Sequence, residues 1–258
     1  MGAPPAASGG GYPPPAPPRR RGGVGRILLI IGIVVVVLGL VWGAIAAVSL
    51  AVRRSVTRDL VTQSAGAAVR VANECGSISL VQGDAGVVKT RATVKYTLRE
   101  PTVSSEVDDG VVSVRADCQS FGLLSSVSLV VKVPPGGSVE ARSSAGSVQA
   151  DGLSSQLVLR SSAGSISATE LNSRVVSAET SAGSVSLSWA RAADPATISA
   201  TSSAGSVKVL IPDVAGVAYR VDADSSAGST KVNVRSDPQS RRTITATSSA
   251  GSVLVDYR

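Results

Sequence analysis

Histidine is absent from the 258-residue sequence. It is the usual base of Ser-His-Asp and Cys-His catalytic sites and a frequent zinc ligand, so its absence excludes those sites. The G-x-S-x-G, P-loop and G-x-G-x-x-G patterns are absent as well, and so are the glycine-aspartate nonapeptides that bind calcium. We therefore expect a protein that is not an enzyme, with no catalytic residue, no cofactor and no metal site.

Aromatic residues are also few: one Phe, two Trp and four Tyr. A core built from large rings is therefore excluded, and Val, Ala, Leu and Ile must fill the interior. The abundance of glycine, 26 residues, suits closely stacked backbone with small side chains between the layers. Trp189 has no second aromatic placed to share a sugar, so we expect it to be an apolar lid rather than a sugar platform.

Acidic pairs of the kind that cleave polysaccharides are poorly placed in this sequence. Asp222 and Asp224 are two residues apart, so in a strand they share the outward face. Glycoside hydrolysis instead needs two carboxylates facing each other across a sugar. Asp108 and Asp109 precede Gly110, a pattern typical of a turn. Both pairs are expected to be solvated surface acids.

Positive charge is unevenly distributed along the chain, whose net charge is +7. Residues 1–58 contain seven Arg and no acid, whereas the rest of the chain has eighteen basic and eighteen acidic residues. Binding of nucleic acid requires basic charge on the folded domain itself. We therefore expect no nucleic-acid partner.

The first 66 residues divide into three segments. Residues 1–25 are rich in Pro and Gly and are expected to be a disordered cytoplasmic tail, either merely solvated or a ligand for a proline-binding domain. Within 26–52, the uncharged apolar run 27–52 exceeds the roughly 20 residues that span a bilayer. It is also too long for a signal-peptide core of about 7–15 residues. A polar connector is expected at 53–66.

The apolar run is therefore expected to be a single uncleaved transmembrane helix. Four Arg precede it and three follow it, the last of these partly offset by Asp59. This bias favours a cytoplasmic N-terminus. The C-terminal domain would then be extracellular.

Six copies of one short motif, "SSAGSV" or a close variant, occupy the C-terminal half of the chain. Repeats of about 20–50 residues are typical of stacked solenoids. The spacings between the six glycines are 18, 19, 22, 23 and 23 residues. The glycines are Gly146, Gly164, Gly183, Gly205, Gly228 and Gly251.

The alternation of apolar residues changes phase at each glycine. Before Gly205, the residues on the apolar face include Ser202 and Ala204, which are two positions apart. After Gly205, the next residue of the apolar face is Val207, three positions from Ala204, so the even spacing is broken. Successive side chains of a strand point to opposite faces, so the change requires a bend, for which glycine supplies unusual backbone angles. We predict an all-β, single-stacked parallel β-solenoid over 67–258, with the serine and the following alanine inside a narrow corner.

An altered copy of the motif, "VRVANECGSISL" at 69–80, precedes the six. It places Asn73 at the inward serine position, Cys75 at the second alanine position and Gly76 at the corner. Residues 81–138 are expected to form longer strands in looser rungs. The outward serines are expected to be solvated rather than to bind a ligand; they are Ser144, Ser162, Ser181, Ser203, Ser226 and Ser249.

Only two cysteines are present, Cys75 and Cys118, and both fall on inward faces of their runs. In an exported domain, paired cysteines usually form a disulfide. The alternative is that they are two buried thiols acting as small apolar side chains. We favour the disulfide.

The sequence ends in "SVLVDYR", which matches the motif and is followed by no capping segment. A terminal rung exposes unpaired N–H and C=O groups that can pair with another strand. We therefore expect Val253, Val255 and Tyr257 to form an interaction edge, either for self-association or for a partner's strand. The alternative is that the last rungs are short and twisted and that the charged end of the chain, residues 256–258, folds over them.

An apolar span followed by strands with repeated "(S/T)-(S/A)-G-S-(V/I)" motifs, and by "VKVPPGG" at 131–137, resembles the bacterial putative-adhesin domain. That family is a β-solenoid domain of unknown function, and the resemblance covers roughly residues 67–258. It implies a cell-envelope location and an adhesive or scaffolding role, with no catalytic residues.

The expected function is thus that of a non-enzymatic, single-pass membrane protein of the cell envelope that contacts an unidentified envelope polymer or protein. The alternative is an envelope-sensing regulatory protein whose ectodomain binds a wall component or a partner protein.

Overall fold

The computed structural model describes residues 31–40, 42–43, 54–63, 68–96, 100–118 and 125–258. The chain divides into two units, residues 1–52 and residues 53–258. In the first unit, residues 31–40 and 42–43 are helical. No helix within the described residues is long and apolar enough to cross a membrane. The tail expected at 1–25 and much of the span expected at 26–52 lie outside the described residues.

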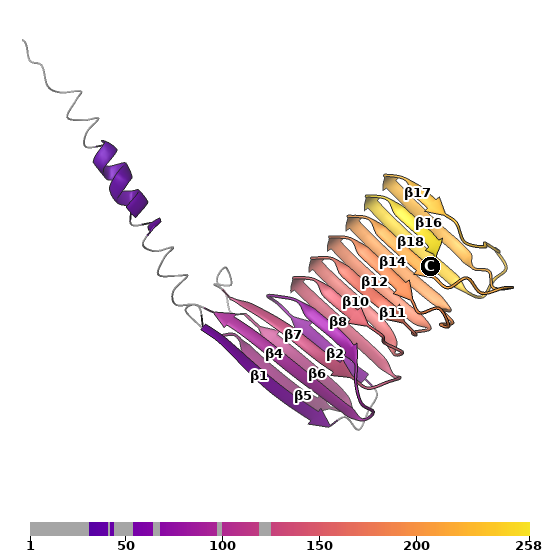
Figure 1. Ribbon diagram of the computed structural model, residues 1–258, viewed down its shortest axis with the longest axis horizontal. Coiled ribbons are helices and arrows are strands. Elements are labelled where there is room, and N and C mark those ends of the chain that lie inside the picture. The colour runs from indigo at the N-terminus through magenta and orange to yellow at the C-terminus, as the bar shows by residue number, and fades with distance from the viewer. Residues whose placement is uncertain (1–30, 41, 44–53, 64–67, 97–99, 119–124) are drawn as a thin grey trace, which may run out of the picture. The chain divides into compact units, whose positions relative to one another are not determined.

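The second unit consists of two β-sheets with the apolar core between them (Figure 1). Sheet A contains, in spatial order, β1 (Arg54–Gln63), β4 (Val87–Tyr96), β7 (Ser126–Val133), β3 (Ile78–Gln82), β9 (Val148–Asp151), β11 (Ile166–Leu171), β13 (Val185–Trp189), β15 (Val207–Ile211), β19 (Val253–Tyr257) and β17 (Thr230–Val232). Sheet B contains β16 (Arg220–Ala227), β18 (Thr243–Ala250), β14 (Thr197–Ala204), β12 (Val175–Ala182), β10 (Gln156–Ala163), β8 (Ser138–Ala145), β2 (Ala68–Asn73), β6 (Val111–Asp117) and β5 (Thr102–Asp108).

Each rung of the stack is one strand of sheet B followed by one strand of sheet A, and in the β2–β3 rung and the six repeats a glycine forms the corner between them. Neighbouring rungs pair in parallel with equivalent residues side by side, so that Ser161 lies between Ser143 and Thr180. Alternate residues point into the core, where the apolar side chains of all the rungs form one cluster. The predicted all-β, solenoid-like stack of repeats is confirmed.

The N-terminal end of the stack differs from the prediction because it is partly antiparallel. Residues 54–63, expected within a polar connector, form β1, which pairs antiparallel with β4. Val56 and Leu60 are half-buried on one face of β1, so this segment carries enough apolar alternation to extend sheet A.

Residues 81–138, expected to be looser rungs, contain one regular rung and two antiparallel strands. β6 and β7 form a rung that pairs in parallel with β2 and β3. β4 pairs antiparallel with β7, and β5 pairs antiparallel with β6. Asp109 (φ 47°) and Gly110 (φ 76°) make the tight turn between β5 and β6, as the pattern around Asp108 predicts.

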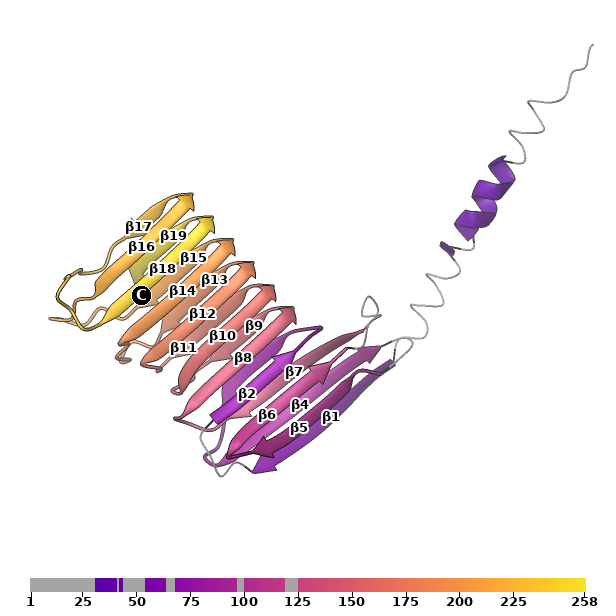
Figure 2. The ribbon, with the colours of Figure 1, turned by 180° about the vertical axis from the view of Figure 1, so that it is seen from behind.

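The last two rungs are interchanged in space relative to their order in the chain. β18 and β19 lie between the β14–β15 rung and the β16–β17 rung, which is outermost (Figure 2). The prediction that Val253, Val255 and Tyr257 form the edge is therefore wrong. Val253 and Val255 are buried inside the stack, and Tyr257 pairs with a residue of β15.

The composition of the two rungs explains their order. The inward positions of β18 and β19 are filled by Ile244, Val253 and Val255, all buried. β17 is exposed along its whole length, and its middle residue is Lys231. Placing the more apolar rung inside removes more apolar surface from water, which is the dominant favourable contribution to packing.

Candidate functional site

The conserved spacing of the repeat produces one hydrogen bond per corner. In each of the six SSAGSV-type repeats the inward hydroxyl donates to the carbonyl oxygen of the corner glycine in the adjacent rung. A buried carbonyl without a partner would destabilise the fold, which accounts for a hydroxyl at this position. The bonds are Ser143 to Gly76 (2.9 Å), Ser161 to Gly146 (3.0 Å), Thr180 to Gly164 (2.8 Å), Ser202 to Gly183 (2.8 Å), Ser248 to Gly205 (2.8 Å) and Ser225 to Gly251 (2.6 Å).

The corner glycines are required because adjacent backbones approach closely. A Cβ atom added at Gly183 would lie 2.5 Å from the carbonyl oxygen of Gly164, and the φ of Gly183 is +142°. Gly76 and Gly228 lack this positive φ, but a Cβ at either would clash with a neighbouring carbonyl. The corners are thus filled by protein backbone and offer no space to a ligand.

The alanine before each glycine lies on the exposed side of the corner, which corrects the prediction that it is inward. Ala163 is exposed, although Ser161 is buried. The strand pairing skips Ser162, which lies between them, so the bend begins at the outward serine and not at the glycine. The alternation of inward and outward residues thus changes phase at Ser162, and Ala163, which follows the change, points outward.

Some of the serines on the outside of the corners accept hydrogen bonds from backbone amides of the adjacent rung. The six outward serines predicted from the sequence are all exposed. In a second row, just after the glycines, Ser165 Oγ accepts from the Ser184 amide and Ser184 Oγ accepts from the Ser206 amide, both at 3.2 Å. These hydroxyls satisfy backbone groups of the adjacent rung and so have a structural role.

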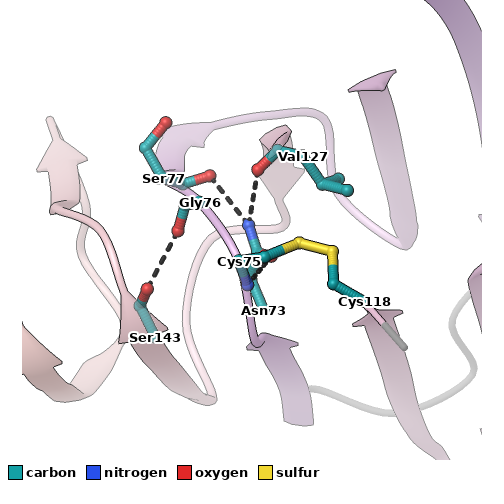
Figure 3. The surroundings of a disulfide bond; sticks show 7 residues. All are labelled: Asn73, Cys75, Gly76, Ser77, Cys118, Val127 and Ser143. Carbon is teal, nitrogen blue, oxygen red and sulfur yellow. Dashed lines mark hydrogen bonds between the residues drawn. A yellow bond between two sulfur atoms is a disulfide. The ribbon is translucent and has the colours of Figure 1, made fainter. Parts of the chain in front are cut away.

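The altered corner at Asn73 is fixed by side-chain hydrogen bonds and a disulfide (Figure 3). Asn73 Nδ2 donates to the carbonyls of Val127 (2.7 Å) and Ser77 (3.2 Å), and Asn73 Oδ1 accepts from the Cys75 amide (3.2 Å). Cys75 is joined to Cys118, with a Cα–Cα distance of 6.0 Å, within the usual range for a disulfide. The bond ties the β2–β3 corner to the end of β6.

The remaining residues singled out in the sequence are two exposed acids and a buried tryptophan. Asp222 and Asp224 are exposed on β16, as predicted. Trp189 is fully buried, and its Nε1 donates to the carbonyl of Ser173 at 2.8 Å, so it covers the core. No group of three or more His, Cys, Asp or Glu residues in the described part of the chain is placed to hold a metal ion.

Ion pairs fasten the loops near the C-terminal end. Arg242 pairs with Asp194, and Arg258 pairs with Glu170. The hydrogen-bonded guanidinium groups hold the pKa of Asp194 and that of Glu170 below their ordinary values of 3.8 and 4.5. Arg258 Nη1 also donates to the carbonyl of Trp189 at 2.8 Å, which fixes the last residue of the chain.

The outermost rung exposes a strand edge. The Arg220 amide donates to the Arg242 carbonyl at 2.8 Å, so Arg220 bonds toward β18. Because N–H groups alternate in direction along a strand, the amides of Val221 and Ala223 point away from β18, toward the open edge. This edge differs from the predicted one because the last rung of the chain is not the last rung of the stack.

Solved structures of similar fold come from bacterial proteins. A "putative cell adhesion protein" from Clostridium sporogenes superposes with a TM-score of 0.51 at 10% identity, covering 80% of this chain and 100% of that one. A "putative adhesin" from Bacteroides fragilis gives a TM-score of 0.45 at 14% identity, covering 80% of this chain and 97% of that one. No curated protein matches the sequence.

The family model of the Toastrack DUF4097 domain matches residues 69–257. This range covers every rung described above, from the Asn73 corner to the last strand. It agrees with the resemblance to the putative-adhesin domain that the repeated motifs imply. The chain therefore belongs to the Toastrack DUF4097 family.

Proposed function

We propose that this chain is a non-enzymatic, membrane-anchored protein of the cell envelope whose Toastrack domain contacts other molecules through its outermost rung. The observation that carries the proposal is the open edge of β16, where no strand among the described residues lies beside the amides of Val221 and Ala223. An unpaired edge is a template for strand addition, a common mode of protein recognition. The role agrees with the name of the Clostridium protein of similar fold.

The charges on β16 favour a strand from another protein over a second copy of this chain. Asp222 and Asp224 lie on the outward face of β16. Arg220 shares this face, so a second β16 paired in parallel would set each of the three charges against an identical one, which is destabilising. An antiparallel copy centred on Asp222 would pair Arg220 with Asp224 but would still set Asp222 against Asp222. A partner strand with Lys or Arg at alternate positions would instead form opposite-charge pairs.

Anchoring and orientation are proposed on the sequence alone. The apolar run 27–52 is long enough to span a bilayer, and Arg residues are more numerous before it than after it. The N-terminus is then cytoplasmic and the Toastrack domain is outside. A cysteine added after Arg258 should react with a membrane-impermeant maleimide on intact cells; labelling that requires lysis would contradict the orientation.

The test of function is binding of residues 53–258, a compact unit with its own core, to intact host cells and to isolated wall polymers. Ala223→Pro removes an amide at the open edge and keeps the β18 pairing, whereas Ala223→Ser keeps that amide and serves as the matched control. We expect Pro to abolish binding and Ser to preserve it. No binding by the wild type, or equal binding by both variants, would contradict the proposal.

A further inference from the structure

Arginine side chains gather on the outer face of sheet B, near the end opposite to β16. Arg70 and Ala72 point outward from β2, where they alternate with the buried Val69, Val71 and Asn73. Ala72 lies directly beside Arg115 of β6 on one side and beside Arg142 of β8 on the other. The three arginines come from strands that are distant in sequence, and only the parallel pairing brings them together.

A hollow of about 380 Å³ lies at this place, with Ala72 as part of its floor and Arg70, Arg115 and Arg142 among its lining residues. Adjacent strands are about 4.8 Å apart, so the Cα atoms of Arg115 and Arg142 are separated by about 10 Å across Ala72. The alanine methyl group leaves this space open. Two guanidinium groups can therefore approach one ligand from opposite sides.

Glu140, the one acid among the described residues that line the hollow, shows that these arginines converge. Its carboxylate pairs with Arg142 at 2.5 Å and with Arg70 at 3.4 Å. Arg115, by contrast, takes part in none of the ion pairs found among the described residues. The lining thus has three positive charges and one negative charge, a net +2, with one guanidinium free to bind.

We propose that this hollow binds a phosphoryl group. Guanidinium groups bind phosphate oxygens through paired, charge-assisted hydrogen bonds. A phosphate monoester carries a charge of about −1.5 to −2 near neutral pH, which matches the net charge of the lining. The site is separate from the β16 edge, so it does not depend on the function proposed for that edge.

Two sources supply such a group: the headgroup of an anionic phospholipid and a soluble phosphate. The probes are therefore vesicles of phosphatidic acid, whose phosphate is a monoester, mixed with phosphatidylcholine, with pure phosphatidylcholine as blank, and inorganic pyrophosphate. Binding is measured by vesicle co-sedimentation and by titration calorimetry with residues 53–258. Binding of vesicles alone identifies a lipid headgroup, and binding of pyrophosphate identifies a soluble phosphate.

Two matched pairs of variants separate a specific site from general electrostatics. Arg115→Gln should weaken binding about tenfold, as expected for the loss of a hydrogen bond to a charged group. Arg220→Gln removes the same charge from exposed Arg220 on β16 and should have little effect. Glu140→Gln should tighten binding by releasing Arg70 and Arg142, whereas Asp222→Asn, on β16, should not.

Ala72→Glu supplies a further test, since it places a carboxylate between Arg115 and Arg142 and should abolish binding. Circular dichroism confirms that each variant keeps the strand content of the wild type. Failure of both probes to bind the wild type would overturn the proposal. So would equal losses with Arg115→Gln and Arg220→Gln.

Discussion

The hydroxyl of Ser202 donates a 2.8 Å hydrogen bond to the carbonyl oxygen of Gly183 in the adjacent rung. Gly183 itself has no space for a side chain, because a Cβ would meet the backbone of Gly164. Glycine permits the close approach of two rungs, and the hydroxyl satisfies the carbonyl that this approach buries. The recurrence of six small residues thus follows from the stacking of corners.

Gly205→Val should strongly destabilise the domain. Gly205 has φ +148°, and a Cβ there would lie 2.5 Å from the carbonyl carbon of Gly183. Backbone strain and overpacking together predict a loss of about 2–5 kcal/mol in the free energy of unfolding. Ser203→Val, on the exposed face, should change it by less than about 0.5 kcal/mol. Urea melts of both variants check this, and equal effects would contradict the corner geometry.

Ser202→Ala should destabilise by about 1–2 kcal/mol, because it leaves the Gly183 carbonyl buried without its partner. Ser203→Ala is the control, since Ser203 is exposed. Ser202→Thr should retain most of the stability, as Thr occupies the equivalent position at Thr180. If Ser202→Ala and Ser203→Ala melt alike in urea, the inter-rung hydrogen bond contributes nothing measurable.

Removal of the disulfide should loosen the N-terminal rungs. Cys75 and Cys118 are 43 residues apart in sequence, and closing such a loop typically stabilises by about 2–4 kcal/mol. The double variant Cys75→Ser, Cys118→Ser should lose this amount relative to the oxidised wild type and match the reduced wild type. Mass spectrometry of the unreduced protein from its host should find the Cys75–Cys118 peptide. Free thiols at both positions there would show that the bond does not form in the cell.

Acid should weaken the attachment of the C-terminal loops. Since Arg242 lowers the pKa of Asp194 in the folded state, this pair stabilises the fold above the ordinary pKa of 3.8. The contribution is lost as the pH falls from there through the lowered pKa. Asp194→Asn should therefore reduce the melting temperature at neutral pH and show a smaller further decrease in acid. Asp224→Asn, on the exposed β16 face, is the control and should leave the melting temperature at neutral pH close to that of the wild type.

The repeating part of the fold could be predicted from sequence because each corner imposes the same local requirement. Glycine spacing and the change of phase were enough to place Ser202 inward, Ser203 outward and Trp189 in the core. The exposed position of Ala163 could not be obtained in the same way. The alternation of inward and outward residues can change at either the serine or the glycine of the motif. Only the pairing of neighbouring strands shows that it changes at the serine.

The ends of the stack could not be predicted because they depend on which of several segments, distant in sequence, packs best against the neighbouring rung. The order of the last two rungs reflects which of two similar sequences, around Val221 or around Val253, buries more apolar surface against β15 and β14. The arginine hollow arises in the same way, since Arg70, Arg115 and Arg142 are adjacent only through the pairing of β2, β6 and β8. Neither relationship has a local signal in the sequence.

Hydrogen exchange of residues 53–258, alone and with a bound protein of the cell envelope, tests the proposed end of the stack most directly. Alone, amides of β16 and β17 should exchange fastest among the repeat rungs, while those of β18 and β19 stay protected although they are last in the chain. On binding, Val221 and Ala223 should become protected. Fast exchange in β18 and β19, or protection on binding that omits β16, would contradict the account.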